Sequence, residues 1–255
     1  MPRKFEPLPR STVGLVPFEV TSLQAAVQDV IDLALRGGPM PVRLSNAYCV
    51  ALASREDEYA TLLNSPGRNY PDGSPIVWYM RKTRSGRSAQ RVRGPSLFRD
   101  TLTKSADYPV RHFFLGTTET TLTTLVDQLQ KKIPNITVAG RYAPPFAPVD
   151  EAMISTCTEK IRQSDANLVW VALGTPKQDY LATALAETTN LPCVGVGAAF
   201  DFAAGTAMEA PTWVQRIGME WLFRLASEPS RLWRRYLIGN AQFLAVATRN
   251  HWANR

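Results

Sequence analysis

Polar residues follow two short apolar runs of the sequence, at positions where a sheet of parallel strands binds ligands. Thr175, Lys177 and Gln178 follow the apolar run 168–173, and Asp201 follows the next such run. Ligands of open α/β sheets bind beyond the carboxyl ends of the strands, where helix N-termini offer free N–H groups and a partial positive charge. These N–H groups and the Lys177 ammonium suit a diphosphate, and the Asp201 carboxylate suits a sugar hydroxyl. Each string taken alone also fits an ordinary capped start of a helix.

Asp72 is the candidate general base. It lies in the string Tyr70-Pro-Asp-Gly-Ser-Pro75, just before a helix predicted to begin at Ser74 and close in the chain to a basic segment. A carboxylate beside bound phosphates can take the proton of an attacking hydroxyl. Pro-Asp-Gly is also a common turn sequence, so on the residues alone the turn interpretation stays open. The acidic cluster 56–58 is a poorer candidate, because we expect it in the middle of a solvent-facing helix.

The sequence offers little for a metal or a redox cofactor. It has two histidines, His112 and His251, and lacks the Asp-x-Asp pair that commonly holds a metal-bound nucleotide diphosphate. The turn at 116–118, Gly-Thr-Thr, is compatible with phosphate but is not a complete glycine fingerprint, which argues against a dinucleotide-dependent oxidoreductase. Charge on a leaving group would then be met by arginine, lysine and helix N-termini. We therefore expect neither a metal nor a cofactor.

The composition is that of a soluble globular protein: 255 residues, of which 45% are hydrophobic and 20% charged. The longest apolar stretch is far shorter than the roughly 18 residues of a spanning helix, and the first residues lack the apolar segment of a signal peptide. Three cysteines without C-x-x-C spacing predict reduced thiols of a cytosolic protein.

The net charge of +7 is concentrated in two zones. Residues 81–104 hold eight basic residues and one acidic residue, and residues 211–255 hold seven arginines and two glutamates. Basic zones favour anionic partners, which include phosphorylated substrates, a membrane face and nucleic acid. A basic surface that is only solvated is the simpler alternative.

Short apolar strands alternate along the chain with segments of helical periodicity. The expected helices and strands are a helix at 22–35 ended by Gly37, a strand at 41–45, a helix at 47–63, and strands at 111–116, 166–174 and 192–197. This alternation predicts an α/β fold with a Rossmann-like, doubly wound parallel sheet and flanking helices.

The last 50 residues differ from the rest of the chain. They hold four of the six tryptophans, interleaved with arginines, and no strand-like run. Glu228-Pro229 predicts a break between helices at 213–226 and 230–249. We predict an α/β catalytic core at 1–205 and a helical, basic, tryptophan-rich appendage at 206–255 that associates with a membrane. Packing of the tryptophans onto the core, or base stacking in a nucleic-acid-binding module, would explain the same composition.

Several short sequence motifs occur in order along residues 20–245, and the ordered set is more specific for a protein family than any single motif. The strings are Asn46-Ala, Tyr70-Pro-Asp-Gly-Ser-Pro-Ile-Val-Trp78, Arg93-Gly94, Phe113-Phe-Leu-Gly116, Ala172-Leu-Gly-Thr-Pro-Lys-Gln-Asp179, Gly195-Val-Gly-Ala-Ala-Phe-Asp-Phe-Ala-Ala-Gly205, Ala210-Pro-Thr-Trp213 and the stretch 218–236. Together they resemble the WecG/TagA/CpsF family, glycosyltransferase family 26.

The resemblance implies an inverting glycosyltransferase with little or no dependence on metal. It would move a sugar of the N-acetylmannosamine, N-acetylmannosaminuronic acid or glucose type from a UDP-sugar to a polyprenyl-diphosphate-linked glycan, in bacterial cell-surface polysaccharide biosynthesis. The implied location is cytoplasmic and peripheral, on the anionic inner leaflet of the plasma membrane. No nucleic acid partner is implied, and a homo-oligomer is compatible with the sequence. The alternative is a nucleotide- or nucleic-acid-binding α/β protein without transferase activity.

The resemblance also assigns roles to particular residues. Asp72 corresponds to the proposed catalytic base. The expected donor-binding residues are Asn46, Arg93, Gln178 and Asp201 by the resemblance, with Thr175 and Lys177 from the pattern at the strand end. The residues expected to meet the acceptor diphosphate and the membrane are Arg224, Arg231, Arg234 and Arg235.

Two positions depart from the family pattern. Leu44 stands where many members have a threonine, so that the hydroxyl of Ser45 would have to replace the threonine hydroxyl. Glu209 stands where an arginine is usual. The first departure affects an expected contact to sugar or phosphate. The second places a negative charge in the appendage where the family usually has a positive one.

Overall fold

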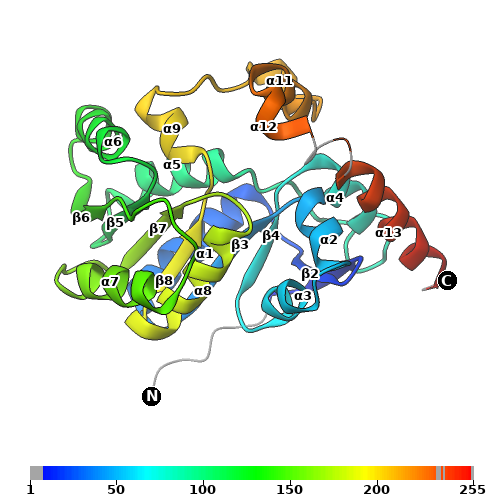
Figure 1. Ribbon diagram of the computed structural model, residues 1–255, viewed down its shortest axis with the longest axis horizontal. Coiled ribbons are helices and arrows are strands. Elements are labelled where there is room, and N and C mark those ends of the chain that lie inside the picture. Colours follow the sequence, from blue (N-terminus) through cyan, green and yellow to red (C-terminus); the bar gives the residue numbers. More distant parts are fainter. Residues whose placement is uncertain (1–7, 234–236, 238, 254–255) are drawn as a thin grey trace.

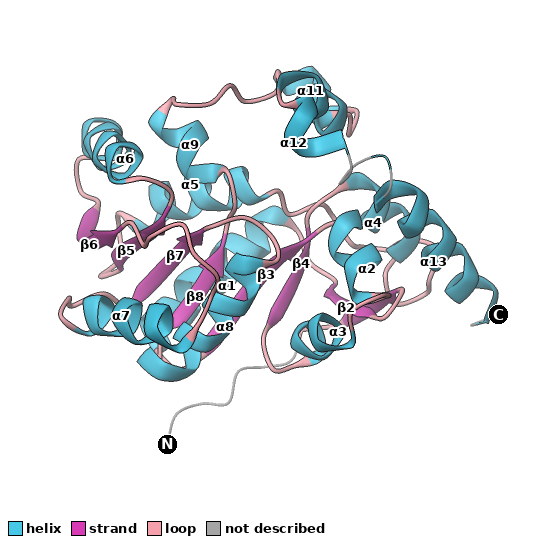
Figure 2. Cartoon of the chain, viewed as in Figure 1, coloured by secondary structure: helices cyan, strands magenta, loops and turns pink. Residues whose placement is uncertain are grey.

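Six parallel strands form the central sheet of the protein (Figures 1 and 2). The computed structural model describes residues 8–233, 237 and 239–253. The strands of the sheet are β3 (Met40–Ser45), β4 (Arg68–Pro71), β5 (Arg111–Gly116), β6 (Thr137–Tyr142), β7 (Leu168–Ala172) and β8 (Pro192–Gly195). Their order is β4-β3-β8-β7-β5-β6, and every neighbouring pair is parallel. The predicted α/β fold with a Rossmann-like parallel sheet is confirmed.

Helices cover both faces of this sheet, as the alternation of strands and helices predicts. The helices of the main layers are α1 (Leu23–Arg36), α5 (Gly94–Ser105), α6 (Glu119–Lys132) and α9 (Ala199–Ala204) on one face, and α7 (Glu151–Arg162) and α8 (Lys177–Thr189) on the other. Successive strand residues alternate between the faces, so that Phe114 packs with the first group and Phe113 with the second. Apolar strands buried on both sides are typical of parallel sheets.

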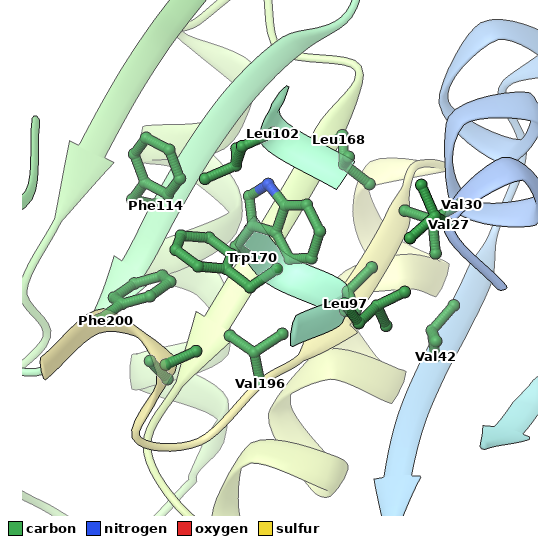
Figure 3. Packing of buried hydrophobic residues seen from close by; sticks show 14 of the residues in the cluster. Val27, Val30, Val42, Leu97, Leu102, Phe114, Leu168, Trp170, Val196 and Phe200 are labelled. Carbon is green, nitrogen blue, oxygen red and sulfur yellow. The ribbon is translucent and has the colours of Figure 1, made fainter. Parts of the chain in front are cut away.

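Trp170 of β7 lies at the centre of the larger cluster, close to Phe114, Phe200 and Leu97 (Figure 3). Its indole N–H donates to Nδ1 of His112 over 3.1 Å. Burial lowers the pKa of His112 to about 3, so this imidazole is neutral at physiological pH. His112 therefore belongs to the packing of the core and takes no part in a proton relay.

The expected helix at 47–63 is divided into α2 (Ala47–Ala53) and α3 (Asp57–Asn64). Glu56 occupies the N-cap position of α3, and Asp57 and Glu58 form its first turn. The expectation that this acidic cluster lies in the middle of a helix is wrong. Carboxylates in a first turn are stabilised by the positive end of the helix dipole, which gives these residues a structural role.

Several elements carry no clear apolar pattern in the sequence. They include the antiparallel hairpin of β1 (Arg10–Val13) and β2 (Val16–Glu19), and the strands β4 and β6. Helix α4 (Ser74–Met80) begins at Ser74, which confirms the prediction. In β4 the pattern is hidden because polar residues are buried there with partners. Arg68 donates to Asp29 over 3.0 Å, and Asn69 donates to the carbonyl of Leu63 over 2.6 Å.

The described residues of the C-terminal segment include the helices α10 (Thr212–Arg216), α11 (Glu220–Ser227), α12 (Pro229–Trp233) and α13 (Gly239–Ala253). The predicted break at Glu228-Pro229 is confirmed. The expected helix 213–226 is interrupted at Gly218, which has φ +75° and whose missing Cβ would lie 2.5 Å from Oγ of Ser74. Helix α13 packs on α2, and its Phe243 joins the cluster around that helix. The division of the chain at residue 205 stays a prediction.

Candidate active site

A cavity of about 720 Å³ lies at the carboxyl ends of β3, β4, β7 and β8. Side chains of α11, α12 and α13 complete its wall, and α11 and α12 are drawn above this edge of the sheet in Figure 1. The sequence-predicted residues that line the cavity are Asn46, Asp72, Arg93, Thr175, Gln178, Asp201 and Arg224. Residues from distant parts of the chain thus meet where an open parallel sheet binds its ligands.

Asp72 follows the last residue of β4 and lies in the cavity wall. Its N–H donates to the carbonyl of Ser45 over 2.9 Å, which fixes its backbone to the end of β3. Burial, followed by the nearby Glu220 carboxylate, raises the pKa of Asp72 from its ordinary value of 3.8 to about 6. Arg93, Arg91 and Arg224 act against this shift. A carboxyl group with this pKa is ionised above about pH 6 and is a stronger base than an ordinary aspartate.

Arg93 lies in the cavity wall directly before α5, but its guanidinium group is already paired. Its Nε donates to Glu220 over 2.6 Å, and a terminal nitrogen donates to Glu209. Arg91 donates to the other oxygen of Glu220 over 2.9 Å. We call Arg91, Arg93, Glu209 and Glu220 the ion-pair cluster. The cluster joins the segment before α5 to α11, so that a phosphate at Arg93 would have to compete with two carboxylates.

Asn46 stands at the end of β3 and caps α2. Its side-chain carbonyl accepts from the N–H of Tyr48 over 3.0 Å. The cap uses the carbonyl oxygen, which leaves the amide NH₂ group to face a ligand in the cavity. Leu44 lines the cavity, whereas the hydroxyl of Ser45 is buried without a hydrogen-bond partner among the described residues and is not part of the lining. The structure therefore does not present the Ser45 hydroxyl in place of the family threonine.

Gln178 and Asp201 tie neighbouring strand ends together. Oε1 of Gln178 accepts from the N–H of Gly197 over 2.9 Å, which joins the start of α8 to the loop after β8. Oδ1 of Asp201 accepts from the hydroxyl of Thr117 over 3.3 Å, which joins α9 to the turn after β5. These contacts hold three loops around one part of the cavity. This part is where we expect a nucleotide-sugar donor.

The structure separates Thr175 from Lys177. Thr175 lines the cavity, but the Lys177 ammonium donates to the carbonyl of Ala147 over 2.8 Å and lies over the ring of Phe146. The N-cap of α8 is Pro176, one residue later than the expected Thr175. Since one residue turns a helix by about 100°, this shift points Lys177 away from the cavity. Lys177 is not among the residues that line the cavity, and its expected contact with a diphosphate stays a prediction.

The cavity also has lining residues that are not among the predicted site residues. Tyr48 and Arg55 come from the region of α2, Gln242 from α13 and Thr117 from the turn after β5. Thr117 belongs to the Gly-Thr-Thr turn, whose incomplete fingerprint was the available signal. No sequence pattern marks Arg55 or Gln242 as a site residue, because only the packing of α13 on α2 brings them to the same wall of the cavity.

The predicted acceptor and membrane arginines divide into two groups. Arg224 of α11 lines the cavity, close enough to Asp72 for its charge to lower the pKa of that carboxyl. The side chain of Arg231 and all of Arg234 and Arg235 lie outside the described residues. Arg224 thus remains a cation that the structure shows in the cavity wall.

The cavity contains the parts that a group transfer from a phosphate to a hydroxyl requires. Asp72 is a carboxylate with a raised pKa, Arg224 supplies positive charge, and the strand-end loops offer polar groups. Positive charge and N–H groups stabilise a leaving phosphate, and a base activates the incoming hydroxyl. The described residues contain no group of three or more His, Cys, Asp or Glu side chains that could hold a metal ion.

Comparison with known proteins assigns this arrangement to a family. The Glycosyl transferase WecG/TagA/CpsF family matches residues 12–255. Two relatives, from Bacillus subtilis (strain 168) and Bacillus spizizenii (strain ATCC 23059 / NRRL B-14472 / W23), are each named N-acetylglucosaminyldiphosphoundecaprenol N-acetyl-beta-D-mannosaminyltransferase. The first is 28% identical over 74% of this chain and 72% of its own length, and the second is 30% identical over 72% and 70%. The chain belongs to the WecG/TagA/CpsF family of glycosyltransferases.

Proposed function

We propose that this enzyme transfers a sugar from a UDP-sugar to a hydroxyl of a polyprenyl-diphosphate-linked glycan, with inversion at the anomeric carbon. The observation that carries the proposal is the position of Asp72, a base of raised pKa, in the same cavity as Gln178, Asp201 and Arg224. The names of both relatives favour N-acetylmannosamine as the sugar and a GlcNAc-diphospho-polyprenol as the acceptor. The product would then be a lipid-linked disaccharide for a cell-surface polysaccharide.

The proposed transfer is a single displacement. The acceptor hydroxyl gives its proton to Asp72 as its oxygen forms a bond to the anomeric carbon. The bond from this carbon to the diphosphate oxygen breaks, and the electron pair leaves with UDP. Arg224 and the N–H groups of the strand-end loops are placed to stabilise the leaving charge. Attack on the face opposite the leaving group inverts the configuration.

A screen of UDP-sugars tests the donor assignment. We expect UDP-N-acetylmannosamine to raise the melting temperature of the protein more than other UDP-sugars, because a ligand that binds the native state stabilises it. The assay that follows is transfer to a short-chain GlcNAc-diphospholipid, with product anomericity read by NMR. A product that retains the donor configuration would contradict single displacement.

The rate of transfer should depend on the protonation of Asp72. Because the pKa of this carboxyl is raised to about 6, its basic form is lost as the pH falls through that value. We expect kcat/KM for the acceptor to be level above about pH 7 and to fall about tenfold per pH unit below pH 6. The measurement is a pH profile from 5 to 8, with circular dichroism to show that the protein stays folded. A rate that stays level down to pH 5, as an aspartate with the ordinary pKa of 3.8 would give, would contradict the expectation.

Donor affinity should depend on Gln178 and Asp201. Removal of a polar group that bonds a ligand or orients its loop costs about 1–3 kcal/mol, so we expect Gln178→Ala and Asp201→Ala to bind UDP about 5- to 150-fold more weakly. Calorimetry measures the affinity. Gln163→Ala is the matched control, since Gln163 is exposed at the end of α7. Unchanged affinity in both cavity variants would remove these residues from the donor site.

We also propose that the helices from residue 206 onward dock on the inner, anionic face of a bacterial plasma membrane. Large apolar side chains on α10 to α12 are exposed, with Trp213 65%, Ile217 56% and Trp233 43% accessible. Apolar residues beside arginines are typical of helices that lie in a membrane interface. None of the described helices combines the length and hydropathy needed to cross a bilayer. Docking of this segment would bring the cavity to a lipid-linked acceptor.

A further inference from the structure

Glu220 holds two arginines at once, in the wall of the cavity. Its Oε1 accepts from Arg91 over 2.9 Å, and its Oε2 accepts from Arg93 over 2.6 Å. The Glu220 side chain is 19% exposed, and those of Arg91 and Arg93 are 23% and 7% exposed. Both carboxylate oxygens are thus engaged by cations in a largely desolvated place. Charge-assisted bonds of this kind are shorter and stronger than neutral hydrogen bonds.

These contacts determine where the first turn of α11 lies. Arg91 also donates to the carbonyl of Gln215 over 2.9 Å, so one guanidinium group joins α10 to α11. Gly218, between these helices, approaches Ser74 so closely that an added Cβ would lie 2.5 Å from the serine Oγ. Ser74 begins α4, two residues after Asp72. The turn before α11 therefore lies on the turn that carries the proposed base.

Charged groups of both signs act on Asp72 in this arrangement. The acidic group that faces it is Glu220 from α11. The basic groups are Arg224 from α11 and Arg91 and Arg93 from the segment before α5. Glu220 thus acts on Asp72 in two ways: its negative charge opposes ionisation of the base, and it holds two of the three cations that favour ionisation.

We propose that Glu220 is a positioning residue for the transfer: by binding Arg91 and Arg93 together, it keeps α11 and its Arg224 in place over Asp72. The inference rests on the proposed role of Asp72 as the base. Glu209, the second acidic member of the ion-pair cluster, binds Arg93 from the segment before α10 and is not part of α11. The position of α11 therefore depends on Glu220 more than on Glu209.

The test is a pH profile of transfer to a short-chain GlcNAc-diphospholipid by Glu220→Gln. The amide keeps the shape of the carboxylate and removes its charge. The Glu220 charge acts on Asp72 more strongly than that of any one of the three arginines, so its loss should outweigh a shift of the released arginines. We therefore expect the acid limb to move to lower pH. Without the ion pairs of Glu220, α11 and its Arg224 can move relative to Asp72. A displacement of about 1 Å in a catalytic arrangement lowers the rate about 10²-fold, so we expect kcat to fall by about this factor. Donor affinity, measured with UDP, should change little.

Two further variants separate positioning from simple stabilisation of the fold. Glu220→Asp keeps the charge, and we expect its acid limb to stay near that of the wild type with part of kcat restored. Glu209→Gln breaks an ion pair of Arg93 as well, but it should leave the acid limb in place. A lower melting temperature for Glu220→Gln with an unmoved acid limb would overturn the proposal.

If Glu220→Gln fails to fold, Arg91→Gln tests the ion pair between Arg91 and Glu220 by changing the arginine instead. This substitution removes a cation that faces Asp72, so the acid limb should move to higher pH, opposite to the first variant. An unmoved limb in Arg91→Gln would also overturn the proposal. If the wild type transfers no sugar to a polyprenyl-diphosphate acceptor, the proposed function itself fails. Transfer by the wild type with unmoved limbs in the variants rejects the role of Glu220 alone.

Discussion

Replacement of Asp72 by asparagine should reduce sugar transfer by about 10²- to 10⁴-fold, the usual contribution of a positioned general base. The amide keeps the size of the side chain, and the backbone bond from Asp72 to Ser45 does not involve the carboxyl group. The fold and the donor loops should therefore persist. We expect UDP to bind Asp72→Asn as it binds the wild type. Single-turnover transfer and calorimetry on the same preparation measure the two effects.

The control for this variant is Asp127→Asn. Asp127 is exposed on α6 and lies outside the cavity lining, so the same chemical change there should leave turnover unaffected. The residual activity of Asp72→Asn should also lose the acid limb near pH 6, because the titrating group is gone. Near-normal turnover by the purified variant would show that another group takes the proton.

The parts of the fold that the sequence predicts well are those with apolar periodicity. Ser22 caps α1 through a bond from the N–H of Ala25, and Gly37 ends the helix, as the sequence indicates. The hairpin of β1 and β2 and the strand β4 could not be predicted, because they contain buried polar groups that are paired with side chains of a neighbouring strand or of other elements. Glu19 at the end of β2 is fully buried and pairs with Arg10, which hides the alternation expected of a strand.

Some features of the candidate site could likewise be predicted from the sequence, and others could not. Residues at strand ends, such as Asn46 and Gln178, could be predicted because a parallel sheet places these ends together. The orientation of Lys177 could not, since it depends on the residue at which α8 begins. The partners of Arg93 were also hidden: Glu220 lies within a matched string, but its contact with Arg93 depends on how α11 folds back over the sheet.

The second prediction with a large expected effect concerns membrane binding by two exposed apolar side chains, Trp213 of α10 and Ile217 at its C-terminal cap. Trp213 and Ile217 are four residues apart and so lie on one side of the chain, whereas Val214 between them is buried. Burial of an apolar side chain of this size contributes about 2 kcal/mol, so the two together would contribute about 4 kcal/mol to membrane binding. The double variant Trp213→Glu and Ile217→Glu should therefore bind anionic vesicles about 10³-fold more weakly.

A truncation after Gly205 is a poorer test of this docking, because it removes Phe243 and Ala247 from the cluster around α2. The substitutions leave that cluster intact. Flotation with anionic vesicles at low and high salt should show that wild-type binding weakens as salt screens the arginines. Leu35→Glu is the matched control, since Leu35 is 42% exposed on α1 but lies near the amino-terminal edge of the sheet, away from the cavity.

The choice of acceptor separates docking from catalysis. If α10 serves only to reach the membrane, the double variant should lose transfer to a long-chain acceptor in vesicles and retain transfer to a soluble short-chain acceptor. If the segment also shapes the cavity, transfer to the soluble acceptor should fall as well, as it should for Arg224→Gln, which removes a cation from the cavity wall. Flotation of the double variant equal to that of the wild type would reject the membrane contact. Since Glu220 joins α11 to Arg91 and Arg93, a membrane that moves these helices would act directly on the surroundings of Asp72.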